Sequence, residues 1–556
     1  MTEETITIYC ENTQTTLEAP VGTTLLDIYH LAGEPLKYRP MSARVNRRVE
    51  GLDYRCYTAV DVEFVDYTHP AGFRTYVRSL CFVLTRAVND LYPDTTFDLE
   101  HSISKGYFCA FDDRRAMSAK QVAQISQRMQ EIIDADIPFT PKTIRTNDAI
   151  EMFRSRGMND KALLIETTGM AYTSYYEMDS YVDYFYGCLT PSSGYINLFG
   201  LIPYEDGMLL QVPRRDYPTR LEEPVRQDSM YRAYKEHLGL QRMMGINNVG
   251  ELNRAVANGE ARRIVMVSEA MQEKQIARIA EKIGQRYNDG VRVVLIAGPS
   301  SSGKTTFCKR LEIQLVTNLL TPIGISLDDY YLNRKNTPRD ENGDYDFESL
   351  YAIDLPYFYS DLKKLINGER IDVPSFNFET GERFYSGRTM QMHDRSVLIL
   401  EGIHGLNPEL TASVSPSCLF RIYVSALTTI SLDGHNWIPT SDNRLLRRLI
   451  RDHRSRGYSA KETIAMWPRI RKGEDRWIFP FQENVDTTFN SAMIYELAVL
   501  RRYVEPILSG IREMDNESAE AYRLLRFLRY FNYIPIEELF PTSLLREFLG
   551  GGNFTY

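Results

Sequence analysis

Long apolar stretches are missing from this 556-residue sequence, and cysteines are few. No apolar run reaches the ~18 residues that a membrane-spanning helix needs, which argues against a membrane protein. The seven cysteines are scattered and none forms a Cys-x-x-Cys pair, so neither a disulfide framework nor a zinc ribbon is indicated. The first residues, Met-Thr-Glu-Glu-Thr, lack the charged-then-apolar order of a signal peptide. These absences predict a cytoplasmic protein with reduced thiols.

Internal repeats, low-complexity segments and an excess of positive charge are also absent. The net charge is −9, with 25% charged and 43% hydrophobic residues, which is the balance of an ordinary soluble protein and argues against a general nucleic-acid coat. One hydrophobic core stops growing near ~250–300 residues, so a chain of this length predicts three or four units. Glycines cluster only at 550–552, and no pattern in the sequence explains that cluster.

Apolar patterns divide the chain into four predicted units. Residues 1–67 alternate apolar and polar positions around one short helix, which predicts a small β-rich unit. Residues 68–225 begin with a helix stopped by Pro93 and continue with a second helix and short strands, as in an α+β domain. Residues 226–290 predict a helical connector. Over 291–556 strands and helices alternate, which predicts an α/β unit with a parallel sheet.

One segment of the last unit predicts a phosphate-binding loop. The apolar strand Val293–Ala297 runs into the pattern G-x-x-x-x-G-K-[ST], and a helix follows. The glycines let backbone N–H groups turn toward a phosphate, and the helix N-terminus adds partial positive charge. Lys304 can reach the β- and γ-phosphates, and the Thr305 hydroxyl can ligate Mg²⁺, so ATP and Mg²⁺ are the expected cofactors. The predicted nucleotide-binding residues are Gly298, Ser300, Ser301, Ser302, Gly303, Lys304, Thr305 and Thr306.

Two further strand ends carry carboxylates. The apolar stretch of residues 323–331, "IGISLDDYY", ends in two aspartates, and a carboxylate there faces the ligand crevice of a doubly wound sheet. Such a carboxylate can accept the proton of an attacking hydroxyl. Glu401 follows the buried strand Val397–Leu400, where P-loop enzymes hold Mg²⁺. The alternative for both sites is an ordinary solvated acid at a strand end.

Residues 441–459, "SDNRLLRRLIRDHRSRGYS", predict an arginine-striped helix. Four arginines fall at helical spacing on one face, beside a leucine face. Next to a P-loop, such a stripe suits a lid that clamps the transferring phosphate. The alternative is a solvated helix whose arginines pair with Asp442 and Asp452. The four arginines are Arg444, Arg447, Arg448 and Arg451.

Residues 291–510 resemble the uridine kinase/phosphoribulokinase family. That family has S-x-D-x-[FY]-Y, E-G-I and R-L-x-R-R-x-x-R-D-x-x-x-R-G motifs after its P-loop, and this chain has "SLDDYY", "EGI" and "RLLRRLIRDHRSRG". The resemblance implies an ATP-dependent kinase that phosphorylates the hydroxyl of a small molecule, foremost the 5′-OH of a nucleoside such as uridine. It implies that Asp328 is the catalytic base and Glu401 the acid associated with Mg²⁺.

The resemblance also implies positions for the lid and the acceptor. Two departures leave the acceptor open: Gly381 stands where uridine kinases carry a base-reading histidine, and residues 427–440 are inserted before the lid helix. A sugar phosphate or a pantothenate-like acid is the alternative acceptor. The implied lid arginines are Arg448, Arg451 and Arg456. The implied acceptor-binding residues, some of them in the "VPSFNF" stretch (373–378), are Asp328, Tyr331, Phe376, Asn377 and Arg383.

The first two units resemble parts of aminoacyl-tRNA synthetases. Residues 1–67 resemble a TGS domain, a small β-grasp fold, through "VGTTLLDI" and "SARVN". Residues 68–225 resemble the domain of threonyl- and alanyl-tRNA synthetases that edits mischarged tRNA, through "LTRAVNDLYPDTTFDLEHSISKGYFCAF" and "VDYFYGCLTPSSGYI". The family's H-x-x-x-H and C-x-x-x-H positions are occupied here by Arg78, Phe82, Phe185 and Leu189.

None of these four side chains can supply the metal or base that editing needs, so the resemblance implies a retained fold without the editing chemistry. This half could also contact RNA. The alternative from another functional class is therefore that the protein is a nucleotide-gated RNA-binding regulator and not an enzyme. The sequence leaves the oligomeric state open.

Overall fold

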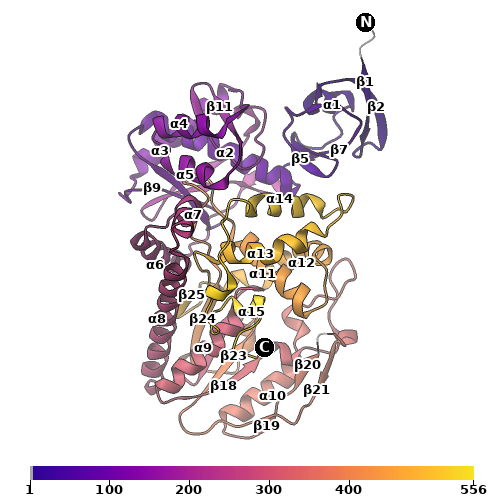
Figure 1. Cartoon of the computed structure of the whole chain (residues 1–556). Helices are drawn as coiled ribbons and strands as arrows, with labels where there is room; N and C mark the ends of the chain where they lie inside the picture. Colours follow the sequence, from indigo (N-terminus) through magenta and orange to yellow (C-terminus); the bar gives the residue numbers. More distant parts are fainter. Residues whose placement is uncertain (1–3, 378, 556) are drawn as a thin grey trace.

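The computed structural model describes residues 4–377 and 379–555, so Phe378, at the end of the predicted acceptor stretch, lies outside the described residues. Figure 1 shows a β-rich unit at the N-terminal end of the chain, in indigo. Its five strands lie in the order β2-β1-β7-β4-β5, and the Thr24 hydroxyl caps the helix by accepting from the backbone N–H of Asp27. The prediction of a small β-grasp unit is confirmed. Its elements are β1 (Thr5–Cys10), β2 (Thr15–Pro20), β3 (Thr23–Thr24), α1 (Leu25–Leu31), β4 (Pro40–Val45), β5 (Arg48–Glu50), β6 (Arg55–Cys56) and β7 (Val60–Asp66).

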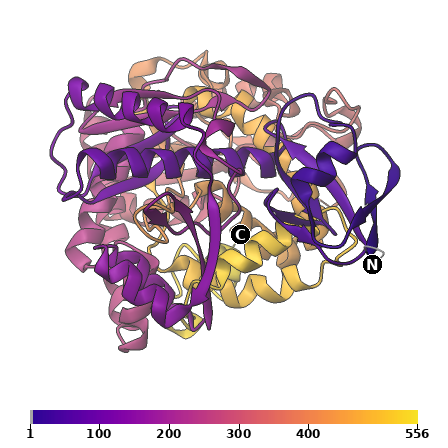
Figure 2. The same ribbon diagram turned by 90° about the horizontal axis from the view of Figure 1, so that it is seen from above.

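The second region is built around one long buried helix, α2 (Pro70–Leu91), which ends just before Pro93 as predicted. The Ser118 side chain and Gln121 form a capping box at α3 (Ala119–Asp134). Figure 2 shows α2 crossing this region toward the β-rich unit. The remaining elements are β8 (Phe97–Ile103), β9 (Gly106–Phe111), β10 (Thr140–Arg145), α4 (Thr146–Ser155), α5 (Asn159–Thr168), β11 (Tyr172–Met178), β12 (Tyr181–Asp183), β13 (Gly200–Tyr204), β14 (Gly207–Gln211), β15 (Pro213–Arg214) and β16 (Tyr217–Leu221).

Three helices connect this region to the parallel sheet: α6 (Asp228–Met244), α7 (Val249–Ala257) and α8 (Ala261–Asn288). The stretch predicted as helical over 226–290 is therefore broken twice, at Gly245 and near Gly259, both of which adopt positive φ angles. α8 then runs along the parallel sheet and ends two residues before Gly290.

The C-terminal region contains a five-stranded, fully parallel sheet in the order β18-β23-β17-β24-β25, which confirms the predicted α/β class. The central strand β17 (Val293–Ala297) is buried throughout, as expected for a sheet covered on both faces. α8 and α9 (Lys304–Thr317) cover one face and α10 (Leu355–Ile366) the other. The other strands are β18 (Thr321–Ser326), β23 (Ser396–Glu401), β24 (Leu419–Ser425), β25 (Thr487–Asn490), and the short pairs β19 (Ile371–Asp372) with β22 (Thr389–Met390) and β20 (Ser375–Asn377) with β21 (Glu382–Phe384).

A helical layer completes this region and lies between the sheet and the N-terminal half (Figure 1). It is formed by α11 (Thr440–Ser455), α12 (Ala460–Trp477), α13 (Glu496–Ser509), α14 (Ser518–Leu528) and α15 (Arg546–Leu549).

The inserted segment 427–440 packs against the synthetase-like region. The buried Lys161 ammonium lies 2.8 Å from the Asp433 carboxylate and 2.8 Å from that of Asp183. The His435 imidazole lies 2.6 Å from Asp183. Because buried charges are stable only when paired, this network links the insertion firmly to the N-terminal half.

Within the described residues, none of the helices combines the length and apolarity needed to span a membrane.

Candidate active site

Three segments meet at the carboxyl edge of the parallel sheet. In the β18-β23-β17 part of the sheet, Glu401 is level with Ile296 on one neighbouring strand and with Ser326 on the other. The phosphate-binding loop begins two residues after Ile296, and Asp328 lies two residues after Ser326. The topology therefore brings the loop, Asp328 and Glu401 to one crevice, where open α/β sheets bind ligands.

The loop that follows β17 has the backbone geometry of an anion cradle. Ser301 and Gly303 have φ angles of 59° and 83°, in the left-handed region. A Cβ atom at Gly298 would lie 2.1 Å from the Val424 carbonyl oxygen, so only glycine fits there. Lys304 is 8% exposed, and its ammonium donates to the Pro299 carbonyl at 3.3 Å. The lysine is therefore folded back over the loop, at the mouth of the cradle.

The first two arginines of the lid helix α11 are structural. Arg444 and Arg447 are almost fully buried, pair with Glu474 and Glu496, and donate to loop carbonyls. Arg447 makes a bidentate pair with Glu496 at 2.9 and 2.7 Å. The four arginines share one helical face, as predicted. Arg444 and Arg447, however, support the phosphate loop from behind. They neither clamp a phosphate nor face solvent.

The other lid arginines converge on the buried carboxylate of Asp452. Arg448, Arg451 and Arg456 lie 3.0, 3.6 and 3.7 Å from it. Arg448 also donates to the Ser300 hydroxyl at 2.7 Å. Burial and the neighbouring Arg456 and Arg448 lower the pKa of Arg451 to about 9. Three cations thus share one carboxylate, and an anionic ligand would relieve their mutual repulsion.

Asp328 faces this positive cluster. Burial raises its pKa, while Lys304, Arg456 and Arg451 act in the opposite direction. Asp329 lies 4.0 Å from Arg388, and its pKa is also raised by burial. The two adjacent aspartates therefore have different surroundings, and the one that faces Lys304 and the lid is Asp328.

Several buried polar groups at the crevice suit the phosphates of a nucleotide with Mg²⁺. The hydroxyls of Ser301 and Ser302 and one terminal nitrogen of Arg451 are buried without a hydrogen-bond partner within residues 4–377 and 379–555, and such donors suit phosphate oxygens. Mg²⁺ usually takes one or two protein oxygens and completes its shell with phosphates and water. Thr305 at the start of α9 and Glu401 at the end of β23 are the residues that would hold it, as the sequence predicts.

Glu401 lies in an environment that favours its protonated form. Burial raises its pKa to about 7, with contributions from Asp328 and Glu547, while Lys304 opposes the rise. A carboxyl group whose pKa is higher in the folded state stabilises the fold below its unfolded pKa, and this stabilisation is lost as the pH rises through the folded value.

We expect Glu401→Gln to raise the free energy of unfolding of the ligand-free protein at pH 8 by on the order of 1–3 kcal/mol, because glutamine removes an ionised buried carboxylate. At pH 5 the gain should be much smaller, because Glu401 is then protonated in the folded protein and only its unfolded form is still largely ionised. Thermal unfolding at both pH values measures this, with the exposed Glu382→Gln as control. An equal gain at pH 5 and pH 8 would contradict the assigned environment.

The predicted acceptor-binding residues lie in two different environments in the structure. Tyr331 and Phe376 are both buried and form an edge-to-face pair with ring centroids 5.6 Å apart, close to Asp328. Asn377 and Arg383 make contacts within the protein: the Asn377 side-chain oxygen accepts from Glu379 and Thr380 in the next turn. Arg383 pairs with Asp354 at 3.0 Å and donates to the carbonyls of Tyr330 and Tyr331.

Sequence reasoning missed two groups beside the crevice. Burial and the nearby Glu474 raise the pKa of Glu348 to about 7, with a smaller contribution from Asp328. His404, three residues after Glu401, is buried, and its pKa is lowered to about 3 by burial. Neither group belongs to the motifs quoted for the family; His404 could have been noticed from its place three residues after Glu401, whereas only folding brings Glu348 to the site.

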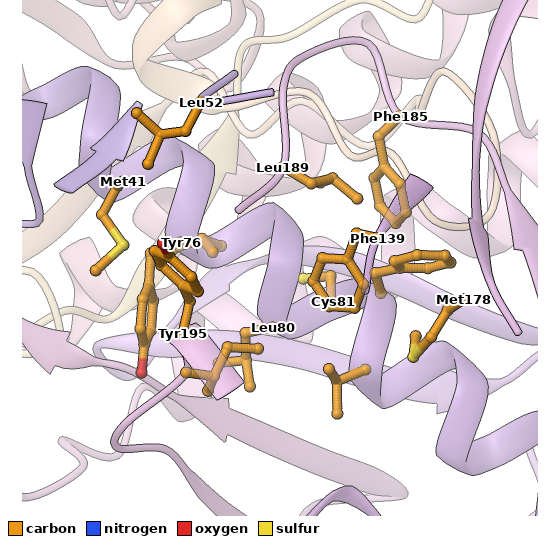
Figure 3. Packing of buried hydrophobic residues seen from close by; sticks show 14 of the residues in the cluster. Met41, Leu52, Tyr76, Leu80, Cys81, Phe139, Met178, Phe185, Leu189 and Tyr195 are labelled. Carbon is orange, nitrogen blue, oxygen red and sulfur yellow. The ribbon is translucent and has the colours of Figure 1, made fainter. Parts of the chain in front are cut away.

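The four positions that the resemblance assigned to an editing site lie among packed side chains of a hydrophobic core (Figure 3). Phe82 packs against Phe185 with ring centroids 5.6 Å apart, and Leu189 is buried beside them. The Arg78 guanidinium donates to the Cys188 carbonyl at 3.1 and 3.0 Å. In the part of the chain that the structure describes, no cluster of three or more histidine, cysteine, aspartate or glutamate side chains could hold a metal.

Comparisons with known proteins divide the chain in the same way. The model of the phosphoribulokinase/uridine kinase family matches residues 293–497. A uridine kinase of Staphylococcus aureus is 28% identical over 195 residues, which are 35% of this chain and 84% of that protein. A uridine kinase of Schizosaccharomyces pombe is 36% identical over 169 residues, 30% of this chain and 33% of that protein.

The N-terminal half matches threonine–tRNA ligases. The ligase of Desulforamulus reducens is 28% identical over 178 residues, which are 32% of this chain and only 28% of that ligase. This chain thus spans less than a third of that relative. The C-terminal part of the chain carries a domain of the phosphoribulokinase/uridine kinase family, behind an N-terminal half similar to threonine–tRNA ligases.

Proposed function

We propose that this chain is an ATP-dependent kinase that transfers the γ-phosphate to a hydroxyl of a small molecule, most specifically the 5′-OH of a nucleoside such as uridine. The observation that carries the proposal is the position of Asp328. It lies opposite Lys304 and the lid arginines, at the edge of the sheet where the phosphate loop begins.

In this mechanism the nucleotide with its Mg²⁺ supplies the phosphoryl group, and the chain positions it and stabilises charge. The loop N–H groups and Lys304 bind the phosphates. Asp328 accepts the proton of the acceptor hydroxyl. Arg448, Arg451 and Arg456 bind the charge that develops on the transferring group. The buried carboxylate of Asp452 holds these arginines in place before the ligand enters.

A nucleoside is favoured as acceptor because a pair of aromatic side chains lies beside Asp328, the proposed catalytic base. The rings of Tyr331 and Phe376 pack together close to Asp328 and make this side of the site aromatic, which suits a flat heterocycle. The similarity to proteins named uridine kinase supports the same substrate class. Gly381 lies where uridine kinases carry a base-reading histidine, so a sugar phosphate or another hydroxyl metabolite is the second candidate.

A screen of nucleosides, sugars and sugar phosphates for ATP-dependent phosphorylation tests the proposal. We expect a nucleoside 5′-monophosphate to form with the wild-type chain and not with Asp328→Asn. Phosphorylation of sugar phosphates alone would move the proposal to the second candidate. If no acceptor reacted, and RNA bound with an affinity that changed with the nucleotide and fell steeply with salt, the chain would be a regulator and not a kinase.

A further inference from the structure

A segment of the chain outside the family motifs lies against the phosphate-binding loop. We call residues 541–552 the strap. Its side chains Ser543, Leu544, Leu545 and Phe548 are fully buried, and Glu547 is 7% exposed. Leu544 and Phe548 belong to the same core cluster as Phe307 of α9. In Figure 1, α15 of the strap lies between the lid helix α11 and the sheet.

The strap brings a carboxylate to the N-terminus of α9. The Glu547 carboxylate accepts from the backbone N–H of Thr306 at 3.1 Å and from the Thr306 hydroxyl at 2.8 Å. The N–H groups of this turn have no partner within the helix, and in P-loop proteins they cradle nucleotide phosphates. Glu547 therefore places negative charge where a nucleotide places its own.

Apolar packing holds the same position. Leu544 lies so close to the loop that a Cβ atom at Gly303 would be 2.5 Å from its Cδ2 atom. The side chain thus covers the glycine that opens the cradle. A nucleotide phosphate that approached Thr306 would meet both the Leu544 methyl groups and the Glu547 carboxylate.

The lid helix holds the strap closed. The Arg454 guanidinium donates to the backbone carbonyls of Phe548 and Glu547, both at 3.0 Å. The Arg447 guanidinium lies over the Phe548 ring, 5.2 Å from its centroid. The lid helix α11, which would close over a bound nucleotide, therefore binds the strap in this structure.

The glycine cluster gives the strap its shape. Gly550 and Gly551 have φ angles of 79° and 69°, in the left-handed region. A Cβ atom at Gly550 would lie 2.8 Å from an Arg454 nitrogen. Past these glycines the chain turns back, and the backbone N–H of Asn553 donates to the Pro541 carbonyl at 3.0 Å. The cluster that no sequence pattern explains thus closes a loop beneath the lid.

We propose that the strap is a built-in competitor of the nucleotide, in which the Glu547 carboxylate occupies a phosphate position at α9 and must leave before ATP binds. This inference rests on the proposed function, since it takes a nucleotide as the competing ligand. When only a fraction of the molecules is competent to bind, the apparent dissociation constant rises by the reciprocal of that fraction. Opening the strap should therefore tighten nucleotide binding.

Calorimetric titration of the full chain with Mg²⁺ and a non-hydrolysable ATP analogue tests the strap. Glu547→Gln removes the charge, and Arg454→Ala releases the backbone of the strap. We expect each change to lower the apparent dissociation constant by about 10-fold or more, because the closed state then competes less well. The exposed Glu537→Gln, ten residues away, should bind as the wild type does.

Hydrogen exchange supplies a second test. If Glu547 only capped helix α9, nucleotide binding would not change exchange in the strap. In the wild type the ATP analogue should speed exchange in residues 545–550 while it slows exchange in residues 304–306. Unchanged or weaker binding by Glu547→Gln, or a strap that stays protected with nucleotide bound, would overturn the inference.

The two proposals fail in different ways. Tighter nucleotide binding by the opened variants, with no acceptor phosphorylated, would refute the kinase and leave the strap standing. Phosphoryl transfer with no effect of Glu547→Gln on nucleotide affinity would refute the strap alone. If neither the wild type nor the opened variants bound a nucleotide, both would fall.

Discussion

Asp328→Asn should lower the rate of phosphoryl transfer by roughly 10²–10⁴, the range for loss of a positioned general base. Asparagine keeps the shape of the side chain but cannot take the acceptor's proton. Nucleotide affinity should change little, because the nucleotide is held by the loop and Lys304. Steady-state kinetics together with analogue binding separates these two effects.

Asp329→Asn is the matched control. The neighbouring carboxylate lies 4.0 Å from Arg388 and does not face the lid arginines, so its loss should leave transfer near the wild-type rate. Since burial raises the pKa of Asp328, the wild-type rate should fall with decreasing pH at values above the usual aspartate range. A silent Asp328→Asn beside a damaging Asp329→Asn would show that the base is the second aspartate.

Lys304→Ala should reduce turnover by at least about 10³, since it removes the one loop side chain that carries positive charge to the transferring phosphates. The lysine also lowers the pKa of Asp328 and of Glu401. Its loss therefore shifts both acids toward their protonated forms, which weakens the base and the Mg²⁺ ligand together.

Lys309→Ala is the control for this change, because Lys309 lies on the same helix and pairs with Glu312 at 3.4 Å near the surface. It should retain turnover, and both variants should keep the wild-type circular dichroism spectrum. Normal turnover by a folded Lys304→Ala protein would exclude the phosphate-loop assignment.

The parts of the site that lie next to one another in the sequence could be predicted from it. A glycine-rich loop between a buried strand and a helix predicts an anion cradle, because the backbone of that short stretch sets its own geometry. The structure accordingly has left-handed angles at Ser301 and Gly303. Apolar segments that lead into Asp328 and Glu401 predict one crevice, because parallel strands present their carboxyl ends at one edge.

Helical periodicity predicted that four arginines lie on one face of α11, but it could not predict which residues that face contacts. Arg444 and Arg447 pair with glutamates 30 and 49 residues further along the chain. Those partners are on other helices, and no local pattern reports them. The same limit concealed Glu348, which comes to the crevice through packing alone.

The sequence by itself determined the phosphate loop, the carboxylates at or just after two strand ends, the parallel α/β class and the residue types at positions 78, 82, 185 and 189, because each depends on residue type and short-range spacing. Only the tertiary structure decided which arginines support the loop, that Phe82 packs against Phe185, and that Glu547 reaches the backbone of Thr306, 241 residues away in sequence. Contacts of that separation depend on how whole elements pack, since burial and charge pairing are properties of the assembled fold.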